Sequence, residues 1–165
     1  MKGNSHPDVQ GPATAVARPG THGPRRILVV EDDSAIRELN AAVLVHHGYR
    51  VDAADDGAVA WDSLQANRYD LLITDNDMPR VTGVELIKKL RAARMALPVI
   101  MATGAIPPEE DIARPWLAAL LLKPYTPDQL LGTVRDVLQA TDNARDPAAS
   151  PPQWQSLHAS ERSWR

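Results

Sequence analysis

Acidic, hydroxyl and ammonium side chains come directly after four short apolar runs of this 165-residue sequence. The residues concerned are Glu31, Asp32, Asp75, Asp77, Thr103 and Lys123. If they meet in one crevice, the carboxylates repel one another, and a hard cation such as Mg2+ relieves that repulsion because it prefers oxygen ligands. The pattern therefore indicates a magnesium site with a lysine and a threonine beside it.

Such a site can form an acyl phosphate on one of its carboxylates. The cation would hold and neutralise an incoming phosphoryl group, and the Asp75 carboxylate would attack phosphorus in line. Lys123 and Thr103 would bind the other equatorial oxygens. The product would be an aspartyl phosphate.

Each of these residues also has an ordinary structural interpretation. Taken alone, Asp75 could be a turn residue after a strand, and Thr103 could be a turn hydroxyl. Lys123 is different, because it closes the apolar run 120–122 and should be partly buried. A partly buried ammonium needs an anion nearby, and the Asp75 carboxylate is the expected partner.

Five apolar runs of strand length supply the elements that must position these groups. They are Ile27 to Val30, Val51 to Ala54, Leu71 to Thr74, Val99 to Ala102 and Ala118 to Leu122. Most are continuously apolar, which is typical of parallel strands buried on both faces by helices. We therefore predict a doubly wound α/β domain in which five strands alternate with five helices. The carboxyl ends of its strands should carry the function.

Helical patterns separate the apolar runs. The first predicted helix has Asp33 or Ser34 as its N-cap, and its buried face should hold Ile36, Leu39 and Val43. The last follows a cap signal at 126–129, and its buried face should hold Leu130, Leu131, Val134, Val137 and Leu138. Between Pro107 and Pro115 we expect only a short or irregular helix.

Composition divides the chain into one domain and two tails. Residues 1–24 are rich in Gly and Pro, and residues 141–165 mix Pro with polar residues without helical or strand periodicity. We therefore expect two disordered tails around a single domain at residues 25–140. No second domain of normal size is expected.

Charge and hydropathy exclude several classes of function. The predicted domain has 13 basic and 17 acidic residues, a net charge of −4, so the basic footprint of a nucleic-acid-binding surface is absent. The apolar run from Trp116 to Leu122 is far shorter than the roughly 20 residues that span a membrane. With no Cys and no apolar leader, we expect a cytoplasmic protein that is not inserted in a membrane and does not bind nucleic acid directly.

Four segments resemble, in order and near spacing, the receiver domain of bacterial response regulators. They are ILVVEDD at 27–33, LLITDNDMPRVTG at 71–83, VIMATG at 99–104 and LLLKPY at 120–125. The resemblance covers about residues 25–140. It implies a flavodoxin-like (βα)5 fold and a phosphoacceptor signalling domain that catalyses only its own Mg2+-dependent phosphorylation and dephosphorylation.

The resemblance also implies a role for each acidic candidate. By position, Asp75 is similar to the phosphoacceptor of the family. Glu31 and Asp32 are similar to the acidic pair that binds Mg2+, with Asp32 as the direct ligand. The backbone carbonyl of Asp77 is implied as a further metal ligand.

Two further candidate residues match the family pattern, and one position departs from it. Thr103 and Lys123 are similar to the hydroxyl and the ammonium that bind the phosphoryl group. The Lys123-Pro124 peptide resembles one that is cis in this family. Leu120 departs from the pattern, because the family commonly has Tyr or Phe there as a rotameric switch, and that aromatic switch is not implied for this chain.

The implied activity is that of a single-domain response regulator. It would take a phosphoryl group from a sensor histidine kinase or a histidine phosphotransfer protein in a phosphorelay. Phosphorylation would switch its binding to a downstream protein target. The readout surface would lie on the segment 107–115, the strand 118–122 and the last helix.

Two other interpretations stay open. Residues 75–77 also resemble the Asp-x-Asp pair of haloacid-dehalogenase-type phosphatases, which would make the protein an enzyme with turnover. Pro79 stands where that family usually has Thr or Val, and the acidic pair precedes the nucleophile instead of following it. A receiver that has lost phosphorylation could serve only as a binding module, although its acceptor, metal acids, hydroxyl and lysine are all present.

Overall fold

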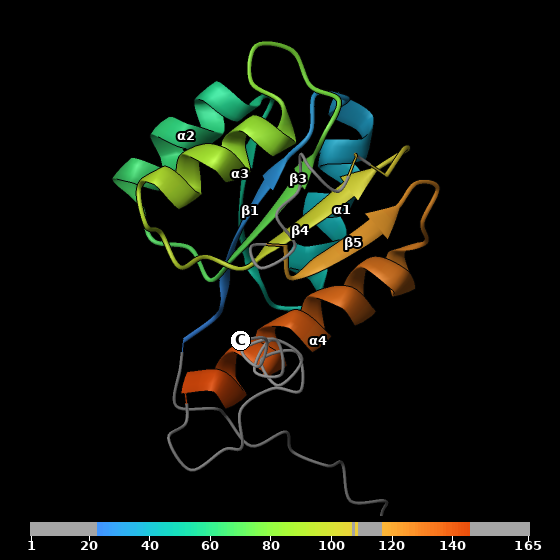
Figure 1. The fold of residues 1–165 in the computed structure, drawn as a ribbon. Helices are drawn as coiled ribbons and strands as arrows, with labels where there is room; N and C mark the ends of the chain where they lie inside the picture. Colours follow the sequence, from blue (N-terminus) through green and yellow to red (C-terminus); the bar gives the residue numbers. More distant parts are fainter. Residues whose placement is uncertain (1–22, 107, 109–116, 146–165) are drawn as a thin grey trace, which may run out of the picture.

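The computed structural model describes residues 23–106, 108 and 117–145, and in these ranges it forms one five-stranded parallel sheet. The strands are β1 (Arg26–Val30), β2 (Arg50–Ala54), β3 (Leu71–Asp75), β4 (Val99–Thr103) and β5 (Ala119–Leu122). Their order is β2-β1-β3-β4-β5 (Figure 1). The predicted doubly wound parallel sheet is confirmed, and each strand end lies within one residue of its apolar run.

Helices cover both faces of this sheet. They are α1 (Ser34–His46), α2 (Gly57–Ala66), α3 (Gly83–Ala92) and α4 (Pro127–Arg145). Helices α2 and α3 lie on one face and α1 and α4 on the other (Figure 1). The short helix expected between Pro107 and Pro115 lies almost wholly outside the described residues. Among the described helices, none has an apolar stretch long enough to cross a bilayer.

The continuous apolar runs follow from a sheet that is covered on both faces. Successive side chains of a strand point to opposite faces. In β1, Ile27 and Val29 join the hydrophobic cluster on the α1 and α4 side, and Leu28 and Val30 join the cluster on the α2 and α3 side. All four are fully buried, so these four positions must be apolar, whereas Arg26 at the start of β1 is only half-buried.

Both predicted helix caps are present. Asp33 Oδ1 accepts hydrogen bonds from the backbone N–H groups of Ala35 (2.8 Å) and Ile36 (3.1 Å) at the start of α1. At the start of α4, Thr126 N–H donates to Gln129 Oε1 (2.8 Å), and Gln129 N–H donates to Thr126 Oγ1 (3.3 Å). The predicted buried face of α4 is also confirmed in all five positions.

The face predicted for α1 is only partly correct, because Ile36 and Val43 are half-buried. The side chain of Leu39 is 56% exposed, whereas Asn40 and Leu44 are buried. Asn40 Nδ2 donates a hydrogen bond to Tyr125 Oη (2.8 Å) in the loop after β5. This partner satisfies the amide, so the buried face can include a polar residue.

Helix α4 continues to Arg145, five residues beyond the domain boundary predicted at residue 140. Thr141 Oγ1 donates to the Val137 carbonyl oxygen (2.8 Å), as a residue inside a helix can do. Asp142 forms an ion pair with Arg25, which also pairs with Asp70 (3.0 Å). The remaining residues of the two predicted tails, 1–22 and 146–165, lie outside the described ranges, and their predicted disorder stays a prediction.

Tyr69 and Arg26 make a second polar connection near the amino ends of the strands. Tyr69 Oη donates to Asp52 Oδ2 (2.7 Å), and Arg26 Nε donates to the same oxygen (2.8 Å). The Arg26 guanidinium also lies 4.9 Å from the centre of the Tyr69 ring. These contacts join the starts of β1, β2 and β3.

Tyr69→Phe is expected to lower the free energy of unfolding at pH 7 by about 1 kcal/mol, because Asp52 loses one hydrogen-bond donor. Burial and then the hydrogen bond to Asp52 raise the pKa of Tyr69 from 10.0 to about 12. Because the pKa of Tyr69 is higher in the folded state, its hydroxyl stabilises the fold fully below the pKa of the unfolded state. This stabilisation is lost as the pH rises through the pKa of the folded state. The difference between parent and variant should therefore shrink from about pH 10 to about pH 12.

Urea unfolding at a series of pH values measures this difference. A difference that stays constant up to the alkaline end of the series would contradict the assigned role of the Tyr69 hydroxyl.

Candidate functional site

Most of the predicted site residues lie at the carboxyl edge of the sheet. Glu31 and Asp32 directly follow β1, Asp75 ends β3, Thr103 ends β4 and Lys123 follows β5. Strands β1 and β3 are neighbours, while β2 lies on the far side of β1. The order of strands reverses between β1 and β3, which is the position where doubly wound sheets bind ligands.

Three carboxylates gather at this reversal. Glu31, Asp32 and Asp75, called here the acidic cluster, each offer an oxygen atom within 4.8 Å of the others. Glu31 is 2% and Asp75 is 6% exposed, whereas Asp32 is open to solvent. A set of oxygen donors with one open side fits Mg2+, which binds through few carboxylates and keeps several waters.

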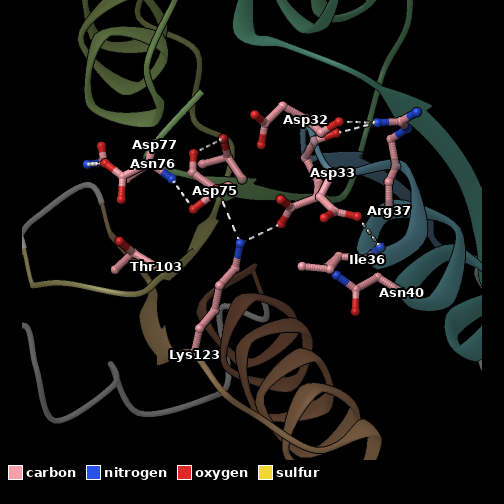
Figure 2. A network of polar contacts seen from close by, with 12 residues as sticks. Asp32, Asp33, Ile36, Arg37, Asn40, Asp75, Asn76, Asp77, Thr103 and Lys123 are labelled. Atoms are coloured by element: carbon pink, nitrogen blue, oxygen red, sulfur yellow. Dashed lines mark hydrogen bonds and ion pairs between the residues drawn. The ribbon is translucent and has the colours of Figure 1, made fainter. Parts of the chain in front are cut away.

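Lys123 connects two members of the acidic cluster. Its Nζ donates a hydrogen bond to Glu31 Oε2 (2.8 Å). It also lies 3.2 Å from Asp75 Oδ2, and Figure 2 shows Lys123 pointing toward Asp75. The ion pair with Asp75 that its position predicted is present. The structure adds Glu31 as the nearer partner, which the sequence pattern did not indicate.

The charges of this group are coupled. Burial raises the pKa of Glu31, and the hydrogen bond from Lys123 offsets part of that rise. Burial alone would lower the pKa of Lys123, but its contacts with Glu31 and Asp75 outweigh burial and raise it. Lys123 therefore stays charged at neutral pH and partly compensates the acidic cluster.

The Asp75 carboxylate is held from two sides. Its Oδ1 accepts a hydrogen bond from the Asn76 backbone N–H (2.7 Å), and its Oδ2 faces Lys123. The Asp75 carbonyl oxygen accepts a bond from Thr74 Oγ1 (2.8 Å). These contacts fix the direction of the carboxylate at the open edge of the sheet (Figure 2).

Thr103 is buried at the end of β4, but its hydroxyl is engaged elsewhere. Its Oγ1 donates to the Ala105 carbonyl oxygen (2.9 Å) and accepts from the Ala105 N–H (3.3 Å). Strand β4 pairs with β3, with Ala102 opposite Asp75. The structure therefore brings Thr103 to the correct edge of the sheet and turns its hydroxyl toward its own loop.

Asp77 lies outside the acidic cluster. Its side chain is exposed, and its Oδ1 accepts a bond from Asn76 Nδ2 (3.2 Å). Among the described residues, the carboxylates close enough to share an ion do not include Asp77. The role of the Asp77 backbone carbonyl as a metal ligand stays a prediction.

Sequence reasoning missed Arg37. Its Nη1 donates to the carbonyl oxygens of Glu31 (2.6 Å) and Asp32 (3.2 Å), and so holds the loop that carries both acids (Figure 2). A signal was available, because a basic side chain near the start of a helix opposes the helix dipole. An arginine in that position is therefore expected to have another partner.

The loop after β5 contains the cis Lys123-Pro124 peptide that the resemblance implied. Leu120, which stands at the position of the family's aromatic switch, is partly buried against the hydrophobic cluster on the α2 and α3 side. Its side chain therefore packs as part of the core.

Comparison with known proteins gives consistent matches. A family model described as the response regulator receiver domain matches residues 27–135. Among curated relatives, the response regulator MprA of Mycobacterium sp. (strain KMS) is 36% identical over 126 residues, which cover 75% of this chain and 55% of the relative. The response regulator MprA of Mycobacterium avium (strain 104) is 37% identical over 118 residues, covering 70% and 52%. The chain thus spans about half the length of the curated relatives it matches.

Solved structures show the same similarity. The chemotaxis response regulator CheY4 of Vibrio cholerae has 32% sequence identity and a TM-score of 0.64, covering 69% of this chain and 98% of that chain. The response regulator protein TrrA of Thermotoga maritima, solved in complex with Mg(2+)-BeF, has 30% identity and a TM-score of 0.63, covering 68% and 98%. The match extends over nearly the whole of each solved chain.

Proposed function

The chain belongs to the family of response regulator receiver domains, and from that premise we propose that Asp75 accepts a phosphoryl group in a Mg2+-dependent reaction. The donor would be the phosphohistidine of a sensor histidine kinase or of a histidine phosphotransfer protein. The aspartyl phosphate would then switch the binding of a downstream protein. Receiver domains of this family act as phosphoacceptors in two-component signalling, and the acidic cluster supports the same role for this chain.

One observation carries the proposal. The buried Asp75 carboxylate lies in the acidic cluster and faces the Lys123 ammonium at 3.2 Å. A lone buried carboxylate would be a weak nucleophile for phosphorus, because an anionic phosphoryl group is repelled by it. Nearby positive charge removes that repulsion, and Lys123 already supplies one such charge.

Glu31, Asp32 and the Asp77 carbonyl are the groups that would hold Mg2+ together with Asp75. When bound, the ion supplies positive charge that neutralises phosphoryl oxygens. An oxygen of Asp75 forms the bond to phosphorus as the bond from phosphorus to the donor histidine nitrogen breaks, and that nitrogen keeps the electron pair. Lys123 then has a phosphoryl oxygen available as a partner in place of the Asp75 carboxylate.

In the proposed switch, the Thr103 side chain would take a second conformation after phosphorylation. Its hydroxyl would leave Ala105 and donate to a phosphoryl oxygen, because the new group adds about −1.5 to −2 charges and strong acceptors. The loop after β4 would move with it. The exposed apolar side chains of Ile106, after β4, and Leu122, in β5, are 64% and 49% exposed and could contact a partner on this side. The proposed readout surface comprises the segment 107–115, β5 and α4.

The cytoplasmic location and the lack of direct nucleic-acid contact stay predictions from the sequence. They concern the whole protein, whereas the proposal concerns the receiver domain itself.

Incubation with acetyl phosphate, with and without Mg2+, followed by intact-mass analysis, tests the proposal. The expected result is one phosphoryl adduct that forms with Mg2+ and does not form when the ion is removed by a chelator. Absence of an adduct in both samples, with steady release of free phosphate, would instead favour a phosphatase with turnover. Absence of both adduct and release would leave a binding module.

A further inference from the structure

The loop between β3 and α3, residues 76–82, is tied at its first residue to the start of α3. The Asn76 carbonyl oxygen accepts bonds from the N–H groups of Met78 and Gly83, both at 3.1 Å. Asn76 Oδ1 also accepts from the Val84 N–H (3.3 Å). The beginning of the loop is thereby tied to the amino end of α3.

The other side of the loop is fixed to α2 by Arg80. The Arg80 guanidinium forms an ion pair with Asp56 Oδ2 and lies 3.8 Å from Asp55 Oδ1. The Asp56 side chain is 0% exposed. Its Oδ1 caps α2 by accepting from the N–H groups of Ala58 (2.6 Å) and Val59 (3.0 Å).

Asp56 depends on Arg80 for the compensation of its charge. Apart from that ion pair, Asp56 Oδ2 has no hydrogen-bond partner in the described part of the chain. A buried carboxylate without a partner is costly. The pairing therefore holds the tip of the loop against the start of α2.

The backbone shows the same close approach. A Cβ atom placed on Gly57, the first residue of α2, would lie 2.5 Å from the Val81 carbonyl oxygen. Arg80 adopts a left-handed conformation with φ of 65°, which costs free energy for a residue other than glycine. A strained residue persists where its surroundings hold it. Here the hydrogen bond from the Val81 N–H to the Pro79 carbonyl oxygen (2.8 Å) and the ion pair with Asp56 both hold Arg80.

We propose that Arg80 is a positioning residue for the Mg2+ site, an inference that rests on the proposed function. Asp77, whose backbone carbonyl is the proposed metal ligand, lies between the two fixed points of the loop at Asn76 and Arg80. The Arg80 to Asp56 ion pair keeps this carbonyl oriented for the acidic cluster before the ion arrives. Without the pair, the loop must be ordered when the ion binds, and that ordering weakens binding.

Binding of Mg2+ measured by calorimetry tests this inference without any phosphorylation. Arg80→Met keeps the aliphatic stem and removes the charge, and we expect its Kd for Mg2+ to rise roughly tenfold, the lower range for groups that orient metal ligands. Arg80→Lys should restore much of the affinity. Arg94→Met is the matched control, because Arg94 has a φ of 54° at the opposite end of α3.

Asp56→Asn separates positioning from simple loss of stability. Its amide oxygen can still cap α2, but it carries no charge for Arg80 to pair with, so its Kd should rise as in Arg80→Met. Adding Arg80→Met to Asp56→Asn should cause little further change, since the same contact is already lost.

The outcomes distinguish this inference from the proposed function. A parent protein that binds no Mg2+ would contradict both. A parent that binds Mg2+ with a Kd unchanged in Arg80→Met, or weakened equally in Arg94→Met, would contradict the inference alone. Independent, additive effects of Arg80→Met and Asp56→Asn would also overturn it.

Discussion

Asp75→Asn is expected to abolish the phosphoryl adduct completely while the domain stays folded and at least as stable as the parent. An amide oxygen is a far poorer nucleophile than a carboxylate, so no bond to phosphorus forms. The variant also removes one of three like charges that lie within 4.8 Å of one another. Lys123 keeps its hydrogen bond to Glu31 at 2.8 Å, so no buried ammonium is left alone.

Intact-mass analysis after incubation with acetyl phosphate and Mg2+ measures the first effect, and thermal unfolding without Mg2+ measures the second. Asp77→Asn is the matched control, because its exposed carboxylate lies outside the acidic cluster and its backbone carbonyl is retained. An adduct of normal yield in Asp75→Asn would place the acceptor on another residue. A variant that loses both the adduct and its folded structure would not support a local role.

Gly83→Ala is expected to have the largest effect on stability, a loss of about 2 kcal/mol or more from overpacking. A Cβ atom at Gly83 would lie 2.3 Å from the Asp75 carbonyl oxygen and 3.1 Å from the Asp75 carbonyl carbon. The contacting atoms belong to backbone, so no flexible side chain can move aside. The start of α3 must shift away from β3, and the phosphoacceptor must shift with it.

Gly132→Ala is the control for this substitution. Gly132 lies inside α4, and a Cβ atom there would have no neighbour within 4 Å. Alanine should therefore stabilise the helix by roughly 0.5–1 kcal/mol. Urea unfolding compares the two variants, and equal stability of Gly83→Ala and the parent would show that the close approach at Gly83 is not real.

Features that depend on strand burial could be predicted from the sequence. A strand covered by helices on both faces must be apolar at every position, so β1, with its four fully buried residues from Ile27 to Val30, appears as a continuous run. Parallel strands end at the same edge, and the residues that follow β1 and β3 lie close because these two strands are neighbours. It could be predicted that the three acids share one edge of the sheet, but the distances between their carboxylates could not be predicted from the sequence.

Features that depend on partners distant in the chain could not be predicted. Asn40 is buried because Tyr125 supplies a hydrogen bond from 85 residues away, which no local periodicity can show. Lys123 contacts Glu31, 92 residues earlier in the chain, although β5 pairs with β4 and not with β1. The ion pair of Arg80 with Asp56 likewise joins two loops, and nothing in the sequence of either loop predicts that they are in contact.

Arg25 stands directly before β1 and Asp142 lies close to the end of α4, and their ion pair brings the two ends of the domain together. This junction is at the amino edge of the sheet, opposite the edge that carries the acidic cluster. A domain whose ends meet can be inserted into a loop of another protein, or circularly permuted, with little strain. The points at which the receiver domain joins other chain segments therefore lie at the edge of the sheet opposite the acidic cluster.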